Sequence, residues 1–151
     1  MWKRLRRFSA LERRARGLFL RAAVLLPLVR LSLRVRGFGA TQAMLRALLS
    51  GSKKALGREQ DSAQLTARMV KAAGRHGLVR ASCLEESLAL WFLLARQGIS
   101  SDLRIGIRRE GDFAAHAWIE HDGCALNEAD APDGHYAAFE TPIPLQPSGT
   151  K

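Results

Sequence analysis

Residues 82–91 read SCLEESLALW, and they decide the fold because they predict a buried helix that begins with a cysteine. Ser82 and Glu85 have the spacing of a capping box, in which the serine hydroxyl and the glutamate carboxylate each accept from the other residue's backbone amide. With Ser82 as the N-cap, Cys83 is the first helical residue. Its sulfur then lies near unpaired backbone amides, which stabilise a negatively charged thiolate. Apolar residues follow at helical spacing, so the helix should be largely buried.

Cys83 has two interpretations. A thiol at the start of a buried helix suits a nucleophile, whereas most free cysteines are small buried hydrophobic residues. The chain holds only one other cysteine, Cys124, so the sequence predicts neither a disulfide framework nor a metal cluster, and its cysteine usage is typical of a reducing compartment. We expect Cys124 to be structural. We expect His76, His121 and His135 to be surface residues without zinc spacing, and we predict no cofactor or metal site.

Length and charge narrow the class of protein. The 151 residues, 47% of them apolar, predict a single domain with a hydrophobic core. Residues 1–80 hold 19 Lys/Arg and 3 Asp/Glu, a net charge of +16, whereas residues 81–151 hold 5 and 11, a net charge of −6. The basic half is either a solvated face of amphipathic helices or a docking surface for an acidic partner, a membrane surface or nucleic acid. Nucleic acid is least favoured, because aromatic residues are sparse and no binding motif is present.

The apolar run at residues 18–29 does not predict a targeting or membrane segment. Arg21 and Pro27 interrupt it, and no small-residue cleavage site follows. The run is also shorter than the roughly 20 apolar residues that a membrane span needs. We therefore expect a cytoplasmic protein.

The first 80 residues predict a series of helices. A capping box at Ser9 and Glu12 starts the first one near Ala10, and Pro27 should kink or end it. The later helices are expected to be a piece at 28–35 that stops at Gly37 and Gly39, a short helix at 42–49 between Thr41 as cap and Gly51, and one that begins at Asp61 or Ser62 and ends near Gly77.

After the cysteine helix, which Gly98 should terminate, the periodicity changes from helix to strand. We expect strands at 103–107, 113–120 and 124–128, with turns at 110–112 and 121–123, and then a loop-rich ending. The plan is an α+β fold, with helices first and an antiparallel meander packed on the cysteine helix. It divides into a basic helical region at 1–80, a catalytic helix and meander at 81–140, and a tail at 141–151.

Cys83 and His116 together suggest nucleophilic catalysis. A cysteine at a helix start, a histidine on a central strand and a polar group on the next strand form a papain-type arrangement, in which the sulfur attacks a carbonyl and the imidazole protonates the leaving amine. The alternative is an ordinary strand histidine that is bonded to backbone. Asp130 is a distant candidate for the polar group that orients the imidazole.

The turn before the third strand selects between two better candidates. A two-residue loop at 122–123 would pair Glu120 with Ala125 and leave Asn127 as the diagonal neighbour of His116. An amide serves this orienting role in papain, so Asn127 stays open.

A three-residue loop with a bulge would instead pair Glu120 with Cys124. That register sets Glu128 directly opposite the histidine. We prefer it, because it also places Trp118 and Leu126 together against the core.

The run at 83–128 resembles the leader peptidase of lasso-peptide biosynthesis, the second B protein, which is a transglutaminase-like cysteine protease. Three stretches carry the resemblance: CLEESLAL at 83–90, GISSDLRIGIR at 98–108 and FAAHAWIE at 113–120. The arginine- and leucine-rich helices before them resemble that family more loosely. The resemblance implies a papain/transglutaminase-like core. It places Cys83 on the family's nucleophile, His116 on its catalytic histidine and Glu128 on its acidic member, where aspartate is usual.

The resemblance also implies a function and partners. The family removes the leader from a ribosomally made precursor, and an ATP-dependent lasso cyclase then joins the freed amine to an acidic side chain. A small separate protein recognises the leader, and we expect the basic helices at 1–80 to dock that protein and the leader. The backbone amide of Cys83 would be one oxyanion donor. The alternatives are a catalytically inactive binding module and an amine acyltransferase that uses the same triad.

Overall fold

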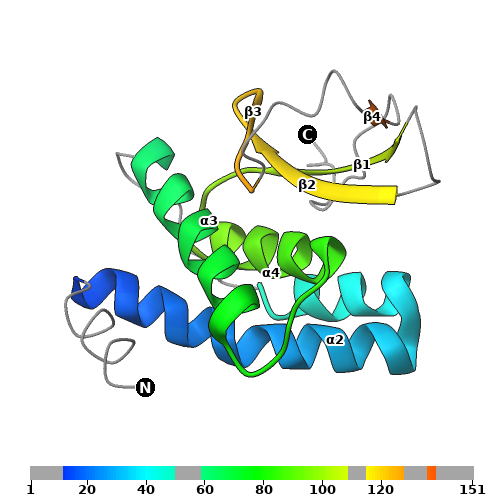
Figure 1. Ribbon diagram of the computed structural model, residues 1–151, viewed down its shortest axis with the longest axis horizontal. Helices are drawn as coiled ribbons and strands as arrows, with labels where there is room; N and C mark the ends of the chain where they lie inside the picture. The colour runs from blue at the N-terminus through cyan, green and yellow to red at the C-terminus, as the bar shows by residue number, and fades with distance from the viewer. Residues whose placement is uncertain (1–11, 50–58, 109–114, 128–135, 139–151) are drawn as a thin grey trace.

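The computed structural model describes residues 12–49, 59–108, 115–127 and 136–138. In these ranges three helices precede a small sheet, and the elements in chain order are α2 (Arg13–Ala47), α3 (Glu59–His76), α4 (Cys83–Arg96), β1 (Asp102–Arg108), β2 (Ala115–His121), β3 (Cys124–Ala125) and β4 (Tyr136–Ala138). The helix α4 contacts α2 and α3 on one side and the sheet on the other (Figure 1). This is the α+β arrangement that the sequence predicts.

The helix α2 consists of two arms that reverse direction at Gly37. The backbone of Gly37 has φ 76° and ψ −179°, a combination that is essentially restricted to glycine. The second arm folds back along the first (Figure 1), and a buried hydrogen bond of 2.9 Å joins Ser32 Oγ to Thr41 Oγ1 between them. The predicted stop is therefore confirmed at Gly37 but wrong at Gly39, which lies inside the helical second arm. The second arm begins before Thr41, so the prediction that Thr41 caps it is wrong.

The predicted end of the helix at Pro27 is wrong. The first arm of α2 continues through Pro27 with helical backbone. Leu26 and Val29 on either side are completely buried. Packing of these neighbours therefore outweighs the lost backbone hydrogen bond and the ring clash that a proline brings to a helix. None of the helices in the described residues is long and apolar enough to cross a membrane.

The ends of the predicted helices agree only in part. α3 already includes Asp61 and Ser62 in its first turns, so neither is its cap, and it ends at His76 as predicted. Ser62 serves a different role, because its Oγ accepts a hydrogen bond of 2.8 Å from Arg14 Nη2 and so links α3 to α2. α2 begins at Arg13 with Glu12 as its N-cap in non-helical backbone, so the predicted helix start near Ala10 is wrong. Ser9 of the predicted capping box and the predicted helix end at Gly51 lie outside the described residues.

The sheet has the order β3-β2-β1-β4 with antiparallel neighbours. The meander of β1, β2 and β3 is confirmed. β4, which pairs with β1 through Gly106 and Ala138, was not predicted, because its three residues lie in a stretch rich in turn signals. β3 is shorter than predicted, since its paired residues are Cys124 and Ala125. The predicted turn at 110–112 lies outside the described residues.

One apolar cluster joins the helices to the sheet. It draws fully buried residues from every layer, among them Leu26, Val29 and Leu45 of α2, Val70 of α3, Leu90 and Leu94 of α4, Leu103 of β1 and Ile119 of β2. Residues 87–94 of α4 are all buried, as the sequence predicts for the cysteine helix. The central position of α4 means that its N-terminus, where Cys83 lies, is fixed by contacts from both sides.

The reversal at Gly37 gives a direct test of the fold. A Cβ at Gly37 would meet no atom within 4 Å, so the cost of Gly37→Ala is the backbone conformation alone, about 1–3 kcal/mol of unfolding free energy. Gly39→Ala is the matched control. It lies in the helical second arm with equally open surroundings and should stabilise the protein by about 0.5–1 kcal/mol. Urea denaturation measures both, and a Gly37→Ala protein as stable as the wild type would contradict the reversal.

Candidate active site

The start of α4 has the capping box that the sequence predicts. Ser82 is the N-cap, its Oγ accepts a hydrogen bond of 3.3 Å from the amide of Glu85, and its own amide donates to Glu85 Oε2 at 2.8 Å. Cys83 is therefore the first residue of the helix. Its side chain is partly buried and packs against the apolar cluster. The cap orders the turn that carries the thiol, so the sulfur has a fixed position relative to the free amides of that turn.

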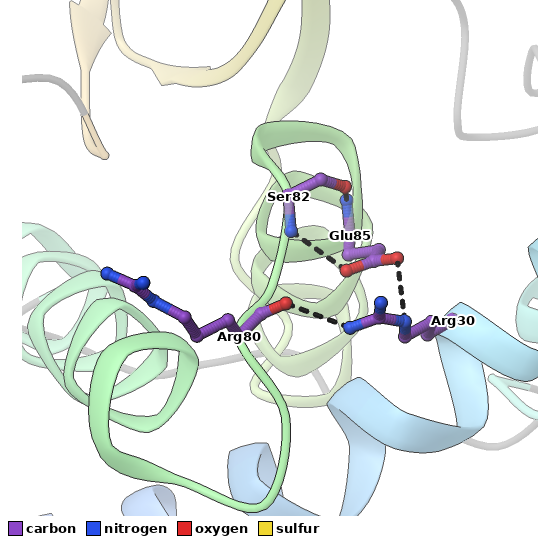
Figure 2. Close-up of polar contacts among 4 residues, drawn as sticks. All are labelled: Arg30, Arg80, Ser82 and Glu85. Carbon is purple, nitrogen blue, oxygen red and sulfur yellow. Dashed lines mark hydrogen bonds and ion pairs between the residues drawn. The ribbon is translucent and has the colours of Figure 1, made fainter.

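Arg30 of α2 contacts both the capping glutamate of this turn and the chain just before it (Figure 2). Its Nη1 donates a hydrogen bond of 3.0 Å to the carbonyl oxygen of Arg80, and its Nε lies 3.9 Å from Glu85 Oε1. The capping carboxylate thus bonds to the N-cap amide and also faces a guanidinium. Sequence reasoning missed Arg30, because its partners lie about 50 residues further along the chain and no local pattern connects them.

A buried hydrogen bond fixes α4 against β2. Ser87, one turn after Cys83, donates through Oγ to the carbonyl oxygen of Ala117 at 3.0 Å. Ala117 directly follows His116. The other end of α4 leads within a few residues into β1, whose first residue pairs with Glu120 near the end of β2. α4 and β2 therefore run in the same direction, and the first turn of α4 lies at the end of the layer where β2 begins (Figure 1).

The imidazole of His116 lies on the sheet face opposite to Ala117 and Ile119, which belong to the apolar cluster. Cys83 packs on that same cluster, so the alternation of β2 turns the imidazole away from the face on which α4 carries the thiol. It stacks on Trp118, with ring centroids 6.1 Å apart and an interplanar angle of 17°. Trp118 Nε1 donates to Glu120 Oε1 at 3.1 Å, and Glu120 Oε2 lies 3.3 Å from the Nε of Arg104 on β1. Three side chains in series therefore support the imidazole ring, and Gly106 lies opposite it on β1.

The hairpin between β2 and β3 has the register that we did not prefer. His121 pairs with Cys124 and Glu120 with Ala125, so the loop consists of two residues, Asp122 and Gly123. Both loop residues have positive φ, 49° and 75°, as in the type I′ turn that matches strand twist. The preference for the three-residue loop was wrong because it assumed that Trp118 packs on the core.

Leu126 packs on the core, as the preferred register also predicted, but it does so without Trp118. Its amide donates to the carbonyl oxygen of Ile119 at 2.9 Å, and its side chain packs on the apolar cluster. Trp118 is buried on the other face of the sheet, beside His116. The alternation of β2 therefore separates two apolar residues that the sequence pattern could not distinguish.

Asn127 links β2 to α4. Its Oδ1 accepts a hydrogen bond of 2.8 Å from the amide of Ile119, and its Nδ2 donates to Ser87 Oγ at 3.1 Å. The side chain is buried, and it replaces the ladder bond that a longer β3 would have made to β2. Asn127 thus holds the same Ser87 that bonds to Ala117, so a buried polar cluster lies one helical turn from Cys83.

The remaining cysteine, histidine and acidic residues named in the sequence analysis are only partly within the described residues. Glu128, Asp130 and His135 lie outside the described residues. His76 is exposed, as predicted. Cys124, which we expected to be structural, is exposed on β3.

His121 was expected at the surface, and that prediction is wrong, because 96% of the residue is buried. The alternation of β2 places it on the same face as Ala117 and Ile119. Its Nδ1 lies 2.6 Å from the carbonyl oxygen of Ser100.

Comparison with known proteins identifies the family. A family model described as the transglutaminase-like superfamily matches residues 25–141, which is more than half of the chain and includes α4 and the sheet. That superfamily includes cysteine proteases and acyltransferases as well as inactive members. Neither the curated proteins nor the solved structures contain a match. With a cysteine at the capped start of a buried helix and a histidine on the adjoining strand, the chain belongs to the transglutaminase-like superfamily.

Proposed function

We propose that this protein is a cysteine endopeptidase that removes the leader from a ribosomally synthesised precursor during lasso-peptide maturation. The observation that carries the proposal is the position of Cys83 as the first residue of α4, inside a chain of the transglutaminase-like superfamily. The sequence stretches that resemble the lasso leader peptidase support the choice of substrate. Cytoplasmic location is part of the same proposal.

In the proposed reaction, the thiolate of Cys83 attacks the carbonyl carbon of the last leader residue. The amide of Cys83 donates a hydrogen bond to the oxyanion that forms. His116 protonates the leaving amine of the core peptide as the carbon–nitrogen bond breaks, and a thioester to the leader remains. His116 then takes a proton from water, and the resulting hydroxide attacks the thioester, which releases the leader as a carboxylic acid and restores the thiolate beside the protonated imidazole.

The acidic member of the proposed triad is Glu128, on the strength of the resemblance. Its role would be to accept a hydrogen bond from the imidazole and so fix the ring's tautomer. Asn127 is the less favoured candidate, because its amide bonds to Ile119 and Ser87. The support that Trp118 gives to the imidazole is independent of this choice.

The proposed partners follow from the proposed substrate. They are the precursor through its leader, a small leader-recognition protein, and the ATP-dependent lasso cyclase that uses the freed amine. The basic region at 1–80 supports an acidic partner on charge grounds, since it has a net charge of +16.

Mass spectrometry of a precursor peptide tests the proposal. The precursor encoded beside this protein is incubated with the protein and the recognition protein, and we expect a single cut that releases the intact leader. Binding of the precursor without any cut would favour the inactive binding module. A leader recovered as an amide of an added amine would favour the acyltransferase.

A further inference from the structure

The first arm of α2 carries a stripe of large apolar side chains that the rest of the described structure leaves exposed. The members of this α2 stripe recur every three or four residues and are 54–73% exposed: Leu20, Val24, Leu28, Leu31 and Val35. This spacing places them on one face of the helix, over about 22 Å of its length. A continuous apolar row of that length differs from the isolated exposed apolar residues that most surfaces carry.

Two grooves lie along the stripe. The first, of about 610 Å³, lies between the first arm of α2 and the C-terminal half of α4, and Phe92 and Leu93 form its far wall. The second, of about 390 Å³, lies between the two arms of α2, and Met44 and Leu45 form its far wall. Leu25 and Leu28 line both grooves, so the two grooves adjoin along the first arm of α2. The stripe is therefore bordered by concave apolar surface.

The charges around these grooves have one sign. Arg21 and Arg96 line the first groove, and Arg36 lines the second. The described residues that line the two grooves include no acidic side chain. An occupant with acidic groups beside its apolar side chains would therefore be attracted to both grooves.

We propose that the α2 stripe binds an acidic amphipathic helix of a partner protein. Such a helix presents apolar side chains at the same three- and four-residue spacing and can insert them into a groove, while its carboxylates face the arginines. A second copy of this chain fits less well, because it would bring its own arginines against these arginines. A lipid surface fits less well too, because it would contact the exposed stripe without filling the depressions beside it.

This surface is separate from the proposed peptidase site, since the grooves involve the C-terminal half of α4 and Cys83 lies at its N-terminus. The proposal therefore does not depend on catalysis. It also differs from a general basic surface, because both the apolar spacing and the arginine positions should matter for binding.

Fluorescence anisotropy with a designed peptide tests the proposal. The probe is a labelled synthetic helix of about 18 residues, with leucines at matching spacing and glutamates on both flanks. The control peptide has the same composition in an order that destroys the apolar face. We expect the Val24→Gln, Leu31→Gln double variant to weaken probe binding by about tenfold or more. A second double variant, Arg21→Glu with Arg36→Glu, should also weaken it and reduce its dependence on salt.

Leu78→Gln is the matched control. Leu78 is 79% exposed and lines neither groove, so this change should leave probe binding within about twofold of the wild type. The variants replace side chains at the surface, so circular dichroism should show unchanged folding. Equal binding of both peptides, or an equal loss in Leu78→Gln, would overturn the proposal.

Two further results would also overturn it by naming a different occupant. Failure of the probe to bind, with stripe-dependent binding to vesicles of phosphatidylserine and phosphatidylcholine, would assign the stripe to a membrane. The probe could also fail to bind while analytical ultracentrifugation shows a dimer of the wild type and a monomer of the Val24→Gln, Leu31→Gln variant. That result would assign the α2 stripe to a second copy of the chain.

Discussion

Replacing Cys83 with alanine is expected to abolish cleavage of the precursor, with a loss of about 10⁴-fold or more in rate. The thiol is the only protein group in the proposed mechanism that forms a covalent bond to the carbonyl carbon, so no other residue can carry out its step. A time course of leader release by mass spectrometry measures the loss. Cys83→Ala removes a partly buried sulfur and leaves the capping box at Ser82 and Glu85 in place, so the variant should still fold.

Cys124→Ser is the matched control for this prediction. Cys124 is the second cysteine of the chain, and it lies exposed on β3. Its replacement should leave the rate of cleavage within about twofold of the wild type, because the change lies away from the start of α4. An iodoacetamide adduct on Cys83 should block cleavage, while an adduct on Cys124 should not. Cleavage that survives Cys83→Ala would remove the basis of the proposed mechanism.

Replacing Asn127 with alanine is expected to lower the free energy of unfolding by about 2–3 kcal/mol. The change leaves the amide of Ile119 without the acceptor at 2.8 Å and removes the donor to Ser87 Oγ, both in the interior. An unsatisfied buried polar group costs about 1–3 kcal/mol, and the lost side chain adds a small cavity. Urea denaturation, followed by circular dichroism, measures the effect.

Gln60→Ala controls for the loss of an amide side chain as such. Gln60 is exposed on α3, so its replacement should change the unfolding free energy by less than about 0.5 kcal/mol. The Asn127 measurement also separates two roles for this residue. If Asn127→Ala kept wild-type stability but lost cleavage, Asn127 would act on the imidazole rather than as the link between β2 and α4.

Local signals predicted α4 and its start correctly. The capping box depends on residues three apart, and nothing distant competes with it, so Ser82 could be assigned as the N-cap from the sequence. The alternation along 103–107 predicted β1, and the stretch at 113–120 between two turn signals predicted its antiparallel neighbour, of which 115–120 lie in β2. In both cases the residues that decide the structure are close together in the chain.

Features that depend on distant packing could not be predicted. The Asp-Gly dipeptide fits both hairpin registers. The choice between them depended on which face of the sheet the Trp118 side chain lies on. The helix continues through Pro27 because of tertiary burial of its neighbours. The contact of Arg30 with Glu85 has no local pattern either, because these residues lie on different helices.

The exposed α2 stripe could not be predicted from the sequence either. The apolar run at 18–29 supplies the buried face of α2, which includes Leu18, Leu26 and Val29. Leu20, Val24 and Leu28 look equally apolar in the sequence, yet they remain exposed. A surface of this kind becomes apparent only when the packing of α2 on α3 and α4 is known.

Cleavage in water enriched in heavy oxygen tests the central claim most directly. The wild-type protein, the precursor and the recognition protein are combined in the labelled water, and the released leader and core are weighed by mass spectrometry. A hydrolytic cysteine peptidase should place one labelled oxygen in the new carboxylate of the leader and none in the core, with no reaction in Cys83→Ala. A leader released without label, or joined to an amine, would contradict the peptidase account.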